Sequence, residues 1–172
     1  MSLEIKQVIT RRDLSEYICL PQKLHLHHPG WVPPIYSNEW KFLNPSSNKA
    51  LTYSDHIMYL ACLDGKAAGR IMGIINNRCN EYRHEKNARF GYLECRDNQD
   101  IAHLLLSSVE RWAEERGMSK LVGPMGFYNQ DSAGFLIEGF QHNHTINTYF
   151  NHRFINDLLE KEGYSKEVDY VV

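Results

Sequence analysis

Residues 89–123 read RFGYLECRDNQDIAHLLLSSVERWAEERGMSKLVG, and this stretch decides the fold. Its first part, Arg89 to Arg96, is rich in aromatic and apolar residues and predicts a strand. From Asp100 to Arg116 the apolar residues recur at helical spacing, and Gly117 is typical of the residue after a helix end. Lys120 to Gly123 predicts a second strand. Strand, helix and strand in this order form the unit that builds a parallel pair in an α/β sheet.

The residues before this unit predict a hairpin. An apolar run from Ile57 to Leu63 meets Asp64-Gly65, a dipeptide favoured in two-residue turns, and a second run follows from Ala67 to Ile75. Together with Arg89 to Arg96, these runs predict a three-stranded antiparallel meander.

The N-terminal part predicts one strand and two helices. Glu4 to Thr10 predicts a short strand. Asp13 predicts the N-cap of a helix that runs to about Pro21 or slightly beyond, with Glu16 completing a capping box. Residues 28–56 predict a surface excursion, in which prolines exclude regular structure near the start and a short helix covers about Ser37 to Leu43.

The C-terminal part begins with an irregular polar stretch from Pro124 to Gly139. A helix is predicted at about Asn151 to Glu162, followed by Gly163, and a last strand at Tyr164 to Val172. The complete predicted order is β-α-α-β-β-β-α-β-α-β, an α/β chain with a mixed sheet.

Composition narrows the class of protein. The chain has 172 residues, which predicts a single domain over 1–172. It carries 19 Lys plus Arg against 21 Asp plus Glu, and this scattered net charge of −2 argues against a nucleic-acid partner. No apolar run approaches the roughly 20 residues that span a bilayer, so no membrane segment is expected. Four cysteines without a Cys-x-x-Cys pair suggest a reduced, cytoplasmic protein.

The element order and a set of short motifs resemble the GNAT superfamily of acyl-CoA-dependent N-acyltransferases. More narrowly, the chain resembles the N-terminal half of a bacterial GNAT-like family whose members are longer. The segments that carry the resemblance are Asp64-Gly65-Lys66, Gly69-Arg70-Ile71, Phe90 to Glu94, Trp112, Glu115 to Met118, Gly123-Pro124-Met125, Gly134 to Ile137, Gly139-Phe140 and Leu158 to Tyr164.

This resemblance implies transfer of an acyl group from acetyl-CoA, another acyl-CoA or a pantetheine carrier to an amine, so the expected partner is a small-molecule amine or an acyl carrier. It also implies that the strand at Arg89 to Arg96 splays from Lys120 to Pro124, so that the pantetheine pairs with exposed strand backbone. The pyrophosphate would lie at the start of the next helix. The residues expected to contact the cofactor are Leu93, Cys95, Arg96, Gln99, Asp100 and Ile101.

The chain departs from the family pattern at three positions. Gln99 and Ile101 replace small residues that let a phosphate rest on the helix start, and Leu159 replaces a tyrosine that many members use as the acid. Asp97 and Asp100 are the expected caps of an ordinary helix and would repel a phosphate. The alternative to an acyltransferase is therefore a catalytically silent GNAT-like module that binds a metabolite or a partner.

Two segments hold the candidate catalytic residues. Glu94 lies at the end of the splayed strand, where a general base is needed, although it could equally be a solvated glutamate. In the irregular stretch, Asn129 could hold a carbonyl or amide, and Asp131 could bind the amine or act as base. The same stretch could instead simply form turns. Tyr149 and Tyr164 are interpreted as structural.

Nine histidines raise the question of a metal, with His25, His27 and His28 in one cluster and His142 and His144 in another. A clamp of two histidines is sterically feasible in either cluster. No cysteine or acidic residue stands at a recognised zinc spacing. The sequence therefore predicts no metal site, and the histidines are interpreted as surface or interface residues.

The predicted last strand leaves the sheet one strand short of the usual GNAT ending, in which a two-strand hairpin follows the last helix. The sequence therefore predicts that a C-terminal second domain of a longer protein, or a second copy in a homodimer, pairs with the exposed edge.

Overall fold

A mixed sheet organises the chain, whose computed structural model describes residues 2–28, 30–128, 130–142 and 150–170. Its strands follow one another in chain order, β1 to β4 are antiparallel, and β4 and β5 are parallel. The strands are β1 (Leu3–Gln7), β2 (Ser54–Leu63), β3 (Lys66–Asn76), β4 (Asn87–Cys95) and β5 (Lys120–Val122).

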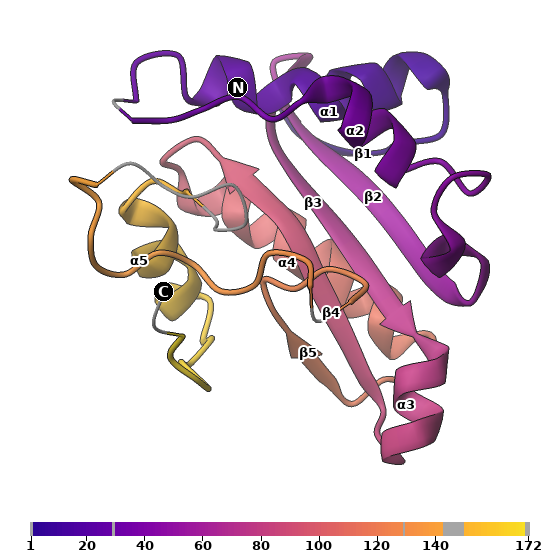
Figure 1. The fold of residues 1–172 in the computed structure, drawn as a ribbon. Coiled ribbons are helices and arrows are strands. Elements are labelled where there is room, and N and C mark those ends of the chain that lie inside the picture. Colours follow the sequence, from indigo (N-terminus) through magenta and orange to yellow (C-terminus); the bar gives the residue numbers. More distant parts are fainter. Residues whose placement is uncertain (1, 29, 129, 143–149, 171–172) are drawn as a thin grey trace.

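Helices cover both faces of this sheet (Figure 1). The first face carries α1 (Arg11–Leu24), α2 (Tyr36–Phe42) and the 3-10 turn η1 (Lys49–Thr52), and the second carries α4 (Gln99–Glu114) and α5 (Phe154–Lys161). A further helix, α3 (Asn77–Arg83), joins the end of β3 to the start of β4.

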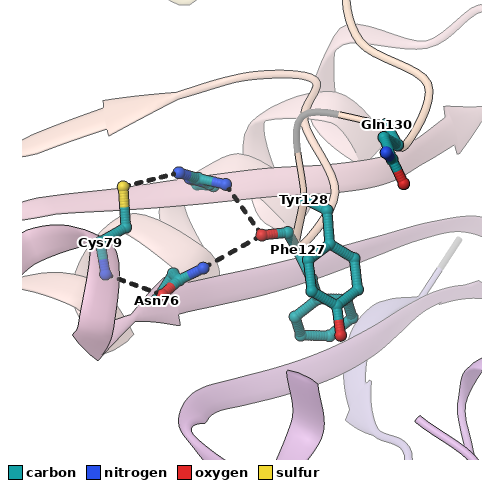
Figure 2. Close-up of a pocket in the computed structure, with 6 residues that line it drawn as sticks. Asn76, Cys79, Phe127, Tyr128 and Gln130 are labelled. Carbon is teal, nitrogen blue, oxygen red and sulfur yellow. Dashed lines mark hydrogen bonds between the residues drawn. The ribbon is translucent and has the colours of Figure 1, made fainter. Parts of the chain in front are cut away.

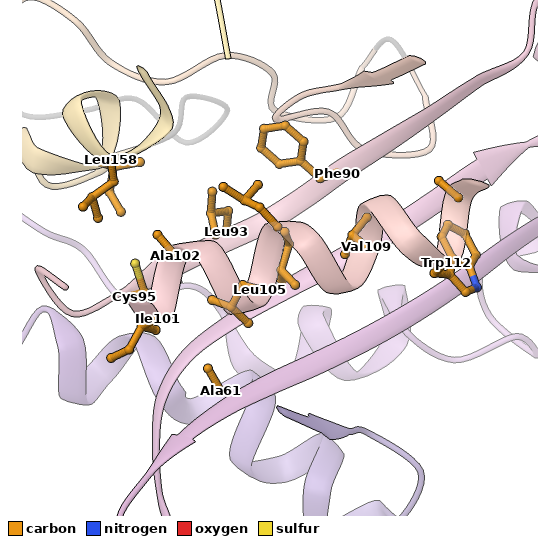
Figure 3. Packing of buried hydrophobic residues seen from close by; sticks show 14 of the residues in the cluster. Ala61, Phe90, Leu93, Cys95, Ile101, Ala102, Leu105, Val109, Trp112 and Leu158 are labelled. Atoms are coloured by element: carbon orange, nitrogen blue, oxygen red, sulfur yellow. The ribbon is translucent and has the colours of Figure 1, made fainter. Parts of the chain in front are cut away.

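Each face of the sheet buries its own hydrophobic cluster. On β3, Ile71 and Ile75 point to the α4 side, whereas Met72 and Ile74 point to the α1 side, and all four are at most 1% exposed. This is the strand alternation expected of a central strand buried on both faces. Figure 3 shows the α4 side, where Leu158 of α5 lies near Ala102 at the start of α4 and Trp112 lies at the other end of the helix.

The predicted hairpin and the long predicted helix are confirmed. Asp64 and Gly65 both take positive φ, at 49° and 74°, as a tight hairpin turn requires. Gly117, with φ 74°, follows α4. Gly69 lets α4 approach β3 closely, because a Cβ there would lie 2.8 Å from both Cys95 Cβ and Leu105 Cδ1.

Several predicted boundaries were wrong. The N-cap of α1 is Thr10, whose side chain accepts a bond from Asp13 N, while the Asp13 side chain caps the Thr10 backbone. Asp13 is thus the third helical residue, and the helix continues through Pro21 to Leu24. The polar stretch after β3 forms α3, which the sequence did not predict.

The predicted last strand is also absent from the described part of the C-terminus. Residues 164–170 are irregular, and 171–172 lie outside the described residues.

Residues 28–56 contain α2 and η1, and Leu43, Ala50 and Leu51 of this segment are buried in the cluster on the α1 side.

Replacing Gly69 with Ala is expected to lower the free energy of unfolding by about 1–3 kcal/mol, because the added methyl overpacks the contact between β3 and α4. Urea unfolding followed by circular dichroism measures this change. Lys66→Ala, at an exposed position of the same strand, is the matched control and should change stability by less than about 0.5 kcal/mol. Equal stability of the two variants would contradict the close packing.

Candidate functional site

β4 and β5 pair over a short distance and then separate. Their ladder runs only from Asn87–Lys120 to Arg89–Val122, with one further backbone bond from Met125 N to Phe90 O at 2.8 Å. β4 itself continues to Cys95, and among the described strands only β3 pairs with its last residues. Residues 93–95, named here the open edge of β4, therefore lack a strand neighbour on the β5 side within the described chain.

A close contact marks the point of separation. Gly123, directly after β5, lies so near β4 that a Cβ would collide with the carbonyl oxygen and ring of Phe90. Only glycine fits this approach, after which the chain turns away through Pro124. The expected splay of the two strands is thus present just beyond Phe90.

An extra residue in β4 bends the strand at the same place. Met72 pairs with Gly91 and Arg70 pairs with Glu94, so two steps along β3 correspond to three along β4. Tyr92, within this bulge, has a φ of 56°. Because a bulge bends its strand and re-aims the side chains that follow, it directs Glu94 toward the α1 side of the sheet, where Arg70 lies.

Arg70 of β3 and Glu94 of β4 form an ion pair on the side of the sheet that α1 covers. Arg70 Nη2 donates to Glu94 Oε1 at 2.7 Å, and Nη1 donates to the backbone oxygen of Tyr17 at 2.9 Å. The guanidinium lies 5.1 Å from the ring centre of Tyr17 and 5.0 Å from that of Tyr92. The two charged side chains are only 6% and 19% exposed, so the pair is largely removed from water.

The second oxygen of Glu94 bonds His25, at the C-cap of α1. His25 Nε2 lies 3.2 Å from Glu94 Oε2. Burial alone would raise the pKa of Glu94, but the charge of Arg70 and the bonds to both partners hold that pKa at about 2. Glu94 is therefore an ionised, ion-paired carboxylate rather than a solvated one. Such a weak base takes up few protons near neutral pH.

Three histidines lie together beside Glu94: His25 and His28 at the end of α1, and His152 from a distant part of the sequence. His25 Nδ1 and His28 Nδ1 are 2.9 Å apart, and the ring of His152 stacks on both, with centroids at 4.6 Å and 4.0 Å. His152 Nε2 bonds the backbone oxygen of Leu24 at 3.2 Å. Burial, followed by the two neighbouring histidines, lowers the pKa of His28 to about 4, and burial and His25 lower that of His152. The sequence did not predict the part played by His152.

The expected cofactor residues lie around the open edge and the start of α4. Leu93 and Cys95 point into the core at 3% and 2% exposure, so only their backbones can meet a ligand on the open edge. Burial raises the pKa of the Cys95 thiol to about 12. Arg96 is exposed and lines a cavity of about 270 Å³ together with Lys23, Leu24, Cys95, Asp97, His152 and Phe154.

The N-terminus of α4 already has a cap, and it is not one of the predicted carboxylates. Asn98 is the N-cap, and its side chain accepts a bond from Ile101 N at 3.1 Å. Ile101 is 1% exposed in the core, while Asp100 is exposed in the first turn. Gln99 Nε2 donates to Leu158 O at 3.2 Å and also bonds Glu162, so Gln99 ties α4 to α5.

The irregular stretch after β5 borders a second cavity, which is open to solvent. This cavity, of about 400 Å³, is lined by Asn76, Cys79, Arg89, Phe127, Tyr128 and Gln130 (Figure 2). Phe127 O accepts bonds from Asn76 Nδ2 at 3.0 Å and Arg89 Nη1 at 3.3 Å, which fixes the loop.

Asp131 belongs to this loop. Its Oδ2 accepts a bond from Tyr128 N at 3.0 Å, so the carboxylate helps to build the turn. The cavity lies near Arg89, whereas Glu94 is five residues further along β4, about 16 Å in an extended strand. The two predicted acids are therefore separated: Glu94 lies near the end of β4, and Asp131 lies in the loop that contacts the start of β4.

Other predicted residues have structural surroundings or lie outside the described chain. Leu159 packs against the core cluster beside α4. The Tyr164 hydroxyl donates to Glu110 Oε1 at 2.6 Å, and burial with this bond raises its pKa. Asn129, His144 and Tyr149 lie outside the described residues, and His27 and His142 are exposed.

Comparison with solved structures defines the class of fold. The aminoglycoside acetyltransferase AAC(6')-Iy, in complex with a bisubstrate analogue of CoA, matches 100% of this chain and 97% of its own with a TM-score of 0.58 and 13% identity. A tandem GNAT protein from the clavulanic acid biosynthesis pathway matches 72% of this chain and 37% of its own with a TM-score of 0.55 and 14% identity. The chain has the GNAT fold.

Among curated proteins, the chain is 24% identical over 168 residues to the bacterial ceramide synthase of Caulobacter vibrioides (strain NA1000 / CB15N). The match covers 97% of the chain but only 44% of that protein, so the chain spans less than half of its relative. No family model matches the chain. In the described residues, no helix has the length and apolar character needed to cross a bilayer.

Glu94→Gln is expected to lower the free energy of unfolding by roughly 3 kcal/mol, because it leaves the charge of Arg70 buried without a counter-charge. The double variant Arg70→Met/Glu94→Leu should recover much of this loss, since two apolar side chains replace the pair. Urea unfolding of both variants measures the effect.

Glu81→Gln, at an exposed position of α3, is the control for the amide substitution. A Glu94→Gln variant as stable as this control would show that the ion pair does not hold the strand and α1 together.

Proposed function

We propose that the chain is an acyltransferase module that binds an acyl-pantetheine thioester, as acyl-CoA or on a carrier, and passes its acyl group to an amine. The observation that carries this proposal is the open edge of β4, created by the bulge at Tyr92 and the short ladder with β5. A pantetheine arm contains two amide groups, and such a ligand can pair with a strand edge as a peptide does.

The cavity beside the open edge supports the same proposal. Cys95, the last residue of the open edge, lines this cavity. Arg96 and Lys23 also line it, and their positive charges suit the phosphates of CoA. The Asn98 side chain already accepts the backbone N–H of Ile101 at the helix start, so phosphate binding in this chain would depend on these side-chain cations more than on backbone N–H groups.

The curated relative supports an amine as the acceptor. A ceramide is an amide that joins a fatty acid to a long-chain amino alcohol, so the name of the relative denotes N-acyl transfer. In this proposal, Glu94 is a positioning residue that holds His25 beside the open edge, because its low pKa makes it a poor base. Asp131 and Asn129 remain candidates for contacts with the acceptor.

A catalytically silent binding module is the second candidate. It is favoured by the use of Gln99 and Ile101 as packing residues at the start of α4, and by Leu159 packed against the core where a catalytic tyrosine would otherwise stand. Such a module would bind the thioester without turning it over.

Calorimetric titration of the chain with acetyl-CoA, longer acyl-CoAs and an acylated carrier protein tests the proposal. At least one ligand should bind with a Kd below about 1 mM. Arg96→Ala should weaken binding of CoA thioesters about tenfold, because it removes a charge-assisted contact to phosphate. Arg83→Ala, an exposed arginine on α3 near the start of β4, is the matched control and should bind like the unaltered chain.

Release of free thiol in the presence of amines then separates the two candidates. Turnover supports the acyltransferase, whereas tight binding without turnover supports the silent module. If none of the thioesters binds at millimolar concentration, the acyltransferase is excluded, and a silent module would have to bind a different metabolite or a partner.

A further inference from the structure

We propose that His25, His28 and His152 form a binding site for a divalent transition-metal ion such as Zn²⁺. Each ring offers one nitrogen, and these three nitrogens lie within 4.8 Å of one another. His25 is buried, and His28 and His152 are partly buried. This site does not depend on acyl transfer, because it rests on the placement of the three rings alone.

The two nitrogens closest together set the position of the ion. His25 Nδ1 and His28 Nδ1 face each other at 2.9 Å, so one proton must lie between them when no ion is bound. Two imidazole nitrogens bound tetrahedrally to Zn²⁺ lie about 3.3 Å apart. The ion would therefore replace this proton after a separation of the rings by about 0.4 Å.

Two of the three rings make, through their other nitrogen, the contacts that are common in metal-binding histidines. His25 directs its other nitrogen, Nε2, to the carboxylate of Glu94 at 3.2 Å, and His152 directs Nε2 to the backbone oxygen of Leu24 at 3.2 Å. A ligating histidine commonly donates its second N–H to a carboxylate or a backbone carbonyl, which leaves the first nitrogen unprotonated for the metal. In both residues this leaves Nδ1 as the ligand atom.

The rings need one adjustment to share an ion. All three are parallel within 12°, and an imidazole lone pair lies in the plane of its ring. The ring of His152, stacked over the other two, must therefore tilt to bring its nitrogen toward the ion. The terminal torsion of histidine has a broad energy profile, so rotation about it can supply this tilt, at the expense of the stacking of His152 on Phe154.

The remaining coordination position would face the cavity beside the open edge. His152 lines this cavity together with Cys95 and Arg96. Three protein ligands and one position open to water or a ligand are typical of a zinc site that meets a substrate rather than a purely structural one. Sequence spacing could not reveal the site, because His152 reaches the other two only through the fold.

Isothermal titration of tag-free, chelator-treated protein with Zn²⁺ tests the proposal, and Co²⁺ provides a spectroscopic probe of the ligands. One equivalent of Zn²⁺ should bind with a Kd of about 10 µM or below. Co²⁺ should give the visible absorption of a nitrogen-bound tetrahedral ion. His28→Ala and His152→Ala should each weaken Zn²⁺ binding by at least about tenfold.

His27→Ala is the matched control, since His27 is exposed in the same loop and is not one of the three. Circular dichroism establishes that each variant is folded. The proposal is overturned if the unaltered chain binds no Zn²⁺ at 100 µM, on the order of ten times the expected Kd. It is also overturned if folded His28→Ala and His152→Ala bind as tightly as the His27→Ala control.

Discussion

The ion pair between Arg70 and Glu94 is the interaction on which the site depends. It joins β3 to β4 at the bulge, and through Tyr17 O it joins both strands to α1. The second oxygen of Glu94 extends the connection to His25, where α1 ends. Two charges largely removed from water require each other, because either one alone would carry the cost of its desolvation. Sheet, helix and histidine cluster are therefore held in one arrangement.

The bulge connects this ion pair to the open edge of β4. An inserted residue bends the strand, and the bend separates β4 from β5 just after Gly123 meets Phe90. The same insertion places Glu94 opposite Arg70 while Leu93 and Cys95 remain in the core on the α4 side. A single irregularity thus exposes backbone on one edge of the strand and fixes a charged group beside it.

Local patterns in the sequence predicted the parts of the fold that depend on neighbouring residues. Asp64-Gly65 predicted the hairpin turn, and the apolar spacing with Gly117 predicted α4. The bulge at Tyr92 could not be predicted, since Phe90, Tyr92 and Leu93 place apolar or aromatic side chains on both faces of β4, so that the change in alternation is hidden. The alternation after Tyr164 suggested a strand, but a strand also needs a neighbour, and none pairs with residues 164–170 in the described chain.

The candidate site was predicted only in part. Glu94 and Arg96 were expected near the ligand, but the pairing of Glu94 with Arg70 was not predicted. A signal for it exists, because an arginine within the apolar run from Ala67 to Ile75 indicates a buried counter-charge. A crystal structure of the chain with a bound acyl-CoA would show whether the open edge of β4 holds the ligand. The pantetheine amides should bond to the backbone of residues 93–95, whereas a ligand bound elsewhere, with that edge untouched, would contradict the proposed role of the open edge.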